Sequence, residues 1–153
     1  MRKRVMKRQA SDNEYLHRDF HGAMSVSLDY LARRWGEDAA AEFLRQFATN
    51  YYKPVREDLE ARGLLALKEY LEGIYDREGG IVQSELSENE LVVRVERCPA
   101  ICHMRENEYP VAHMFCLSTR VVNEALCEGS PYQADMPECD PQAGRCVMRF
   151  FRR

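Results

Sequence analysis

The side chains that can do chemistry near neutral pH are concentrated toward the end of this 153-residue chain. Thiols and imidazoles act there as nucleophiles, proton carriers and ligands of soft metals. Two of the four histidines, His103 and His113, lie among the cysteines, which are Cys98, Cys102, Cys116, Cys127, Cys139 and Cys146. The sequence therefore predicts that a chemical site draws on residues 98–146 and that the first half is scaffold.

Cys98 and His103 stand five residues apart around Pro99, at the end of a predicted strand. Loop geometry at a strand end can place both side chains at a cleft, where His103 would act as a base and Cys98 as a nucleophile or a ligand. The alternative is a surface histidine beside a small buried thiol.

His17 and His21 lie four residues apart, on one face of a predicted helix. This spacing can hold a metal between two imidazoles, but it is also typical of a solvated helix face. His21 adjoins the apolar stripe through Phe20 and Met24. We therefore retain His21 alone as a third catalytic candidate.

Composition and charge exclude two classes of protein. A hydrophobic content of 45% with 31% charged residues is that of a soluble globular protein, and no apolar run is long enough to cross a bilayer. The first ten residues hold five Lys or Arg and no acid, which leaves 17 basic and 25 acidic residues and a formal charge of −8 in residues 11–153. Such a charge repels nucleic acid.

The basic segment predicts a flexible tail, residues 1–10, ahead of a single domain, residues 11–153. No apolar segment follows it, so it lacks the middle of a secretory signal and we expect a cytoplasmic protein with free thiols. The sequence leaves the oligomeric state open, a homo-oligomer included.

Apolar periodicity predicts three helices in the first half. The first runs from Ser11 or Asp12 to Gly36, the second from Glu37 to Gly63 with a kink at Pro54, and the third from residue 64 to Gly79-Gly80. Their apolar stripes consist of Phe20, Met24, Leu28, Leu31 and Trp35, then Ala40, Leu44, Phe47, Tyr51, Val55 and Leu59, then Leu64, Leu67, Leu71 and Ile74.

The second half changes to the period of strands. Residues 81–86 and 91–96 predict a hairpin, residues 98–104 a turn or the start of a short helix, and residues 110–128 a long helix. Residues 131–138 and 146–151 predict a second pair of strands. The expected fold is α+β: an N-terminal three-helix layer, then a four-stranded, mainly antiparallel sheet with one further long helix between the hairpins.

Several segments together resemble the L-2-amino-thiazoline-4-carboxylic acid hydrolase family. The most specific is ELVVRVERCPAICHM at 90–104, which contains Cys98 and His103. The others are DFHGAM at 19–24, WGEDAAAEFL at 35–44, GLLALKEYLEGIY at 63–75 and TRVVNEALCEG at 119–129. The resemblance implies a hydrolase that opens a cyclic amidine carboxylate to N-carbamoyl-L-cysteine.

Such a reaction needs a base for the attacking water, a cation for the substrate carboxylate and help for the departing thiolate. Arg94 and Arg120 are the cations nearest in sequence to the cysteines and could clamp a carboxylate, although each could equally be a solvated surface residue. Glu138 could act on the substrate as an acid or base, or could be an edge-strand carboxylate.

The C-terminal pattern EG-x8-EC-x6-C, from Glu128-Gly129 through Glu138-Cys139 to Cys146, is similar to the end of the 4-vinyl-reductase-like small-molecule-binding domains. Some of those domains hold zinc, and the resemblance implies Cys116, Cys139 and Cys146 as the first ligands to test. The chain has no tight C-x2-C pair, though His113-x2-Cys116 could chelate. Ordinary buried thiols are the alternative.

Two functions remain open at this point. The first is a small hydrolase acting on a thiazoline carboxylate or a related C–N or C–S substrate. The second is a non-catalytic domain that binds a small apolar or aromatic ligand, with or without structural zinc. A thiol-based redox protein is a third, which the absence of C-x2-C disfavours.

Overall fold

Glycine and proline residues divide the first half of the chain into four helices. The computed structural model describes residues 18–153, with side chains from Phe20 onward, and the helices are α1 (Arg18–Trp35), α2 (Glu37–Tyr51), α3 (Lys53–Arg62) and α4 (Leu64–Glu78). Gly36 and Gly63 have positive φ, at 92° and 69°, which L side chains rarely adopt, and they separate α1 from α2 and α3 from α4. The predicted start of the first helix, at Ser11 or Asp12, lies outside the described residues.

The second predicted helix is two helices, because Pro54 does more than kink it. Pro54 occupies the first turn of α3, where its missing N–H would be unpaired in any case. Tyr52, with φ −95° and ψ 19°, is the junction between α2 and α3. The helical layer that precedes the sheet therefore contains four helices where the periodicity predicted three.

The sheet has four antiparallel strands, β1 (Ile81–Leu86), β2 (Glu90–Arg97), β3 (Tyr132–Asp140) and β4 (Arg145–Arg152), in the order β1-β2-β4-β3. Both predicted hairpins are present, and the two are joined edge to edge by β2 and β4, with Leu91 opposite Phe150 and Val93 opposite Met148. The register of β3 shifts between Asp135 and Glu138, beside Pro137, which has no N–H for the ladder. The α+β class is confirmed.

Two helices connect the hairpins. Residues 99–106, which the sequence left open as a turn or a short helix, form α5 (Pro99–Glu106), with Pro99 in its first turn. The long helix is α6 (Phe115–Cys127), which begins five residues later than Pro110, where the sequence analysis placed it. Gly129 follows α6 with φ 81°, as the predicted stop requires.

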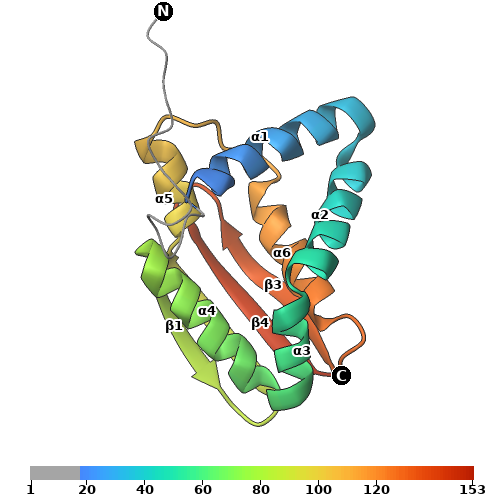
Figure 1. Ribbon diagram of the computed structural model, residues 1–153. Coiled ribbons are helices and arrows are strands. Elements are labelled where there is room, and N and C mark those ends of the chain that lie inside the picture. The colour runs from blue at the N-terminus through green and yellow to red at the C-terminus, as the bar shows by residue number, and fades with distance from the viewer. Residues whose placement is uncertain (1–17) are drawn as a thin grey trace, which may run out of the picture.

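All the helices lie on one face of the sheet, as Figure 1 shows. Leu91, Val93 and Val95 of β2 are buried under them, together with Met148 and Phe150 of β4. The intervening residues of β2 face the other way, so that this sheet buries one face only.

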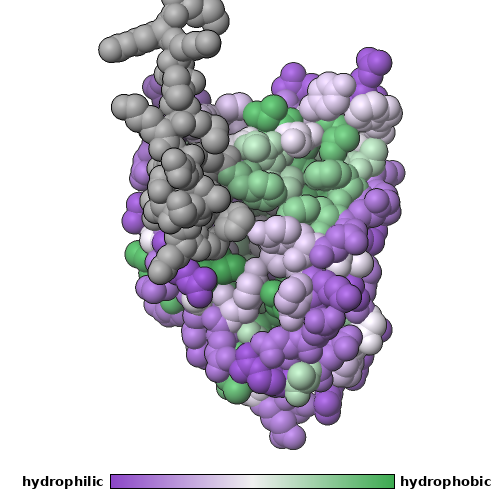
Figure 2. All heavy atoms as spheres, viewed as in Figure 1, coloured by the Kyte–Doolittle hydropathy of each residue, from purple (hydrophilic) through white to green (hydrophobic). Residues whose placement is uncertain are grey.

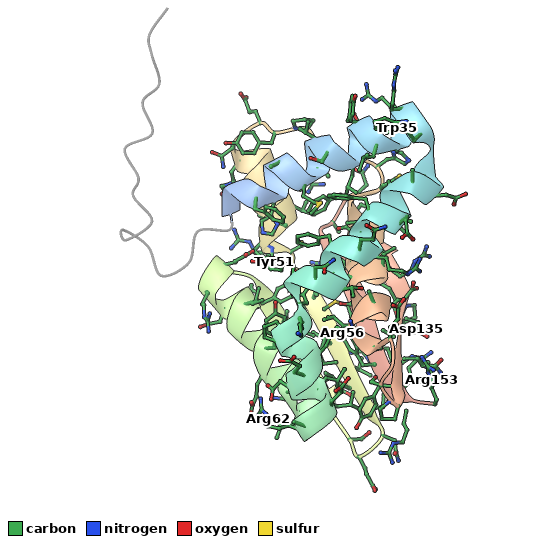
Figure 3. The ribbon with its side chains drawn as sticks, turned by 45° about the vertical axis from the view of Figure 1, so that its right-hand side comes forward. Trp35, Tyr51, Arg56, Arg62, Asp135 and Arg153 are labelled. Atoms are coloured by element: carbon green, nitrogen blue, oxygen red, sulfur yellow. The ribbon has the colours of Figure 1, made fainter. Side chains whose placement is uncertain are left out.

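The buried residues form two clusters that meet at Cys98. One cluster joins α1, α2, α5 and α6 and contains Leu28, Leu44 and Met104, while the other joins α3, α4 and α6 to the sheet. The two ends of the first predicted stripe are not buried: Phe20 is 41% exposed, and Trp35, which is 60% exposed, packs edge-on against Tyr30. Figure 3 labels Trp35 at the end of α1.

Phe150 has no exposed surface and lies at the centre of the sheet cluster. Replacing Phe150 with Ala should lower the free energy of unfolding by about 3–5 kcal/mol, because it removes apolar contacts and leaves a cavity. Urea denaturation monitored by circular dichroism measures this loss.

The matched control is Phe43→Ala on α2, where the phenylalanine is 40% exposed. It should cost less than about 1 kcal/mol. Equal losses for the two variants would contradict the arrangement of the core.

Candidate functional site

A cavity of about 480 Å³ lies among the helices above the sheet. One of its walls is a single stripe of α6, in which the lining residues recur at spacings of three and four, and the facing wall is a similar stripe of α4. Met148 of β4 contributes from the sheet. The α6 residues are Phe115, Ser118, Thr119, Val122, Asn123 and Leu126, and the α4 residues are Tyr70, Leu71, Ile74, Tyr75, Arg77 and Glu78.

Aromatic rings gather where the cavity approaches the surface. The ring of Phe47 stacks between Phe20 and Tyr51, with centroids 5.8 and 5.1 Å away, and Tyr52 packs edge-on against Phe47 and Tyr70. Phe20 and Tyr51 are 41% and 51% exposed and both line the cavity, so solvent reaches it on this side. Figure 2 shows hydrophobic side chains gathered over α1 and α2, and Figure 3 labels Tyr51 at the end of α2.

A histidine and a buried carboxylate form one polar part of the cavity wall. His21 Nε2 of α1 lies 2.8 Å from Glu78 Oε2 of α4, and the Glu78 side chain is only 3% exposed. The His21 ring also packs edge-on against Phe115, with centroids 6.4 Å apart. A carboxylate partner fixes the orientation of an imidazole, so this pair has the geometry of a positioned base facing a bound molecule or water.

Cys98 is a second predicted residue that lines this cavity. It is the residue before α5, and the backbone N–H groups of Ile101 and Ala100 act to lower its pKa. Burial outweighs them and raises the pKa of Cys98, so the neutral thiol persists at neutral pH. The structure thus brings His21 and Cys98 to one cavity.

His103 does not line that cavity, which corrects the prediction that it shares a cleft with Cys98. Residues 99–106 are helical, and five helical positions turn a side chain to a direction roughly 140° away. His103 Nδ1 lies 3.3 Å from Asn107 Nδ2, and its ring packs edge-on against Tyr109. His17, the other histidine of the i,i+4 pair, lies outside the described residues.

The predicted substrate-binding residues lie elsewhere. Arg94 and Glu138 project from the outer face of the sheet, where both line a separate hollow of about 570 Å³, and Arg94 lies 3.8 Å from Glu85. Arg120 is on α6, but its side chain is 52% exposed and lies 3.8 Å from Glu124. The sheet therefore separates Arg94 and Glu138 from His21 and Cys98. Arg120 is separated from them because it lies on the exposed side of α6.

The cavity contains polar residues that the sequence analysis missed. They are Arg77 and Glu78 at the end of α4, the partly buried Tyr75 and the buried Asn123. One signal was available: Leu71, Ile74 and Glu78 succeed one another at spacings of three and then four, so a carboxylate occupies the apolar stripe of its own helix. Burial raises the pKa of Tyr75 well above its ordinary value, so its hydroxyl stays protonated.

Four thiols lie near one another beside the cavity. Cys139 pairs with Cys146 across β3 and β4, Cys116 of α6 is hydrogen-bonded to Cys139, and Cys98 lies close enough to raise the pKa of both Cys116 and Cys146. Burial is the main cause that brings the pKa of Cys116 and of Cys146 to about 12. Among residues 18–153 no group of three or more His, Cys, Asp and Glu side chains has the arrangement that would hold a metal ion. Zinc at Cys116, Cys139 and Cys146 stays a prediction.

His113, the remaining histidine near these thiols, precedes α6 and lies on the surface. Its Nε2 atom is 3.0 Å from Glu37 Oε1.

No helix within the described part of the chain is both long and apolar enough to cross a membrane. No protein-family model matches the chain. A search of curated proteins finds no matching sequence either.

The thiols should react with iodoacetamide in an order set by exposure and pKa. Cys139 is exposed, whereas Cys127 is buried with a pKa raised to about 12 by that burial. At pH 8 only about one Cys127 in 10⁴ would be a thiolate, the form that reacts. Peptide mass spectrometry should find Cys139 modified first and Cys127 last in the native protein.

Denatured protein is the control, since unfolding removes the burial and should make the six rates similar. Modification of Cys127 as fast as Cys139 in the native protein would contradict the burial of this thiol.

Proposed function

We propose that the protein binds a small molecule with an apolar, aromatic-compatible body in the cavity between α4 and α6, and that it does so in the cytoplasm. One observation carries the proposal: a cavity of about 480 Å³, lined mainly by apolar and aromatic side chains, with a few polar groups in its wall. Ligand sites in proteins combine these properties, and their volumes span roughly 300–1,000 Å³.

The energetics support an apolar occupant. Removal of about 200 Å² of apolar ligand surface from water contributes on the order of 5 kcal/mol before the cost of association is subtracted. The stacked rings of Phe20, Phe47 and Tyr51 provide flat surfaces against which an aromatic group of the ligand can stack. His21 and Glu78 supply a polar contact that would orient the ligand.

A side chain that fills the cavity should abolish binding without unfolding the protein. Val122→Trp places an indole in the cavity from the middle of α6, and the fluorescence gain of the probe 1-anilinonaphthalene-8-sulfonate should fall at least about tenfold relative to the unchanged protein. Circular dichroism reports whether the variant is folded.

Val26→Trp is the matched control, because Val26 is 54% exposed on α1 and does not line the cavity. It should leave probe binding within about twofold. Undiminished binding by folded Val122→Trp would refute the cavity as the binding site.

A second function, hydrolysis of a thiazoline-type cyclic amidine carboxylate, is favoured by a different observation: His21, Glu78 and Cys98 line the same cavity. In this proposal His21 takes a proton from water as the water attacks C2 of the ring. The C2–S bond then breaks as C2–O becomes a carbonyl; the hydroxyl proton passes to the ring nitrogen and the proton held by His21 to the departing sulfur, giving N-carbamoyl-cysteine. Arg77, which lines the cavity, is the cation available for the substrate carboxylate.

The hydrolase proposal predicts release of free thiol from L-2-amino-thiazoline-4-carboxylate, measured with a thiol-reactive dye after subtraction of the protein's own cysteines. His21→Ala should reduce the rate by about 10²–10⁴-fold, the usual contribution of a general base. Cys98→Ser distinguishes a nucleophilic sulfur, whose loss stops the reaction, from a merely adjacent one.

His103→Ala is the matched control, because His103 lies outside the cavity and should leave the rate unchanged. No thiol release by the unchanged protein, with probe binding intact, would eliminate the hydrolase and retain the binding function.

A further inference from the structure

One residue of the α6 stripe differs from its neighbours in the cavity wall. Asn123 is only 4% exposed, lines the cavity, and has no hydrogen-bond partner for Nδ2 among the residues that the structure describes. Ser118, on the same stripe, donates its hydroxyl to the carbonyl oxygen of Phe115. Proteins seldom leave a buried amide donor unpaired, because its lost hydration is then not replaced.

A hydrogen-bond acceptor for Asn123 Nδ2 could come from a molecule bound in the cavity. Thr119 and Leu126 are its neighbours on the stripe, at four residues before and three after, and Asn123 Nδ2 has no hydrogen bond to the Thr119 hydroxyl. Leu126 and Met148 of β4 add apolar walls. An oxygen atom on a bound ligand would therefore be the acceptor that the protein itself does not provide for this amide.

The position of Asn123 also sets the shape of such a ligand. Asn123 follows Phe115 by eight residues on α6, which is roughly 12 Å along the helix axis. Phe115 contacts His21, the partner of Glu78, so the histidine and the asparagine lie toward opposite ends of the α6 wall. Between these two polar groups α6 contributes Ser118, whose hydroxyl donates to its own helix, Thr119 and Val122, and the cavity lining as a whole is mainly apolar.

We propose that the Asn123 amide donates a hydrogen bond to an oxygen at one end of an elongated ligand whose body is apolar and about 10 Å long. The ligand class is thus an aromatic or other rigid apolar molecule with a terminal carbonyl or comparable acceptor oxygen. This inference rests on the proposed binding function and adds the group that determines specificity. A site with a buried unpaired donor discriminates strongly against a ligand that lacks the acceptor, since binding would then seal the donor in an apolar environment.

Two probes of equal shape test the proposal: 4-acetylbiphenyl, which carries a terminal ketone, and 4-isopropenylbiphenyl, in which a methylene group replaces the oxygen. Titration calorimetry with the full chain should give at least about tenfold tighter binding of the ketone. In Asn123→Leu the preference should disappear, because the ketone loses its donor while the hydrocarbon gains an apolar neighbour.

The stability of the ligand-free variant separates recognition from a structural role. Asn123→Leu should melt at the same temperature as the unchanged protein or higher, since it removes an unpaired buried donor. A melting temperature several degrees lower would show that Asn123 serves the fold and would overturn the proposal. Should Asn123→Leu fail to fold, the smaller Asn123→Ala replaces it in both the melting and the binding comparison, with the same outcomes expected.

The failures of the two proposals are distinguishable. If both probes bind with equal affinity to the unchanged protein, the role of Asn123 is wrong and the binding cavity stands. If Val122→Trp removes binding but Asn123→Leu retains the tenfold preference for the ketone, the donor is another residue and the inference is again overturned. If neither probe binds to the unchanged protein, the inference fails together with the apolar binding function.

Discussion

The structure depends on the burial of one face of a four-stranded sheet. Leu91 and Val93 of β2 lie opposite Phe150 and Met148 of β4, and these four side chains make an apolar seam where the two hairpins join. An exposed seam of this kind would be costly, so the helices gather on that face and leave the other to charged residues such as Arg94 and Glu96. The arrangement of the six helices follows from this one requirement.

The cavity is a consequence of how the helices cover the seam. Helices α4 and α6 pack onto the sheet, α2 packs against α6, and α1 packs against α2 and α5, so that side chains of six helices approach one volume from different directions. Close packing would fill that volume with apolar groups. Instead, Glu78 and Asn123 are buried in its wall, and each costs stability unless it is hydrogen-bonded. Glu78 has His21 as its partner, whereas Asn123 Nδ2 has none among the described residues.

The same architecture separates two groups of candidate residues. His21 and Cys98 lie on the covered side of the sheet, whereas Arg94 and Glu138 lie on the outer side. Successive side chains of a strand point to opposite faces of the sheet. A shift of one position along β2 would therefore move a side chain from the covered face to the outer face. Burial on the covered side also raises the pKa of thiols, which keeps Cys98, Cys116 and Cys146 in the neutral form.

The sequence by itself determined the α+β class, both hairpins and the helices of the first half, because these follow from local periodicity and from glycines that end helices. It also determined Cys98 and His21 as candidates by residue type. Only the tertiary structure decided that Pro54 separates two helices, that His103 turns away from Cys98, and that Glu78 and Asn123 complete the cavity wall. A proline is compatible with a kink or with a new helix, and residues 98–104 with a turn or a helix, so the folded chain decided the first two. The meeting of Glu78 with His21 joins residues 57 positions apart, and no local pattern carries that information.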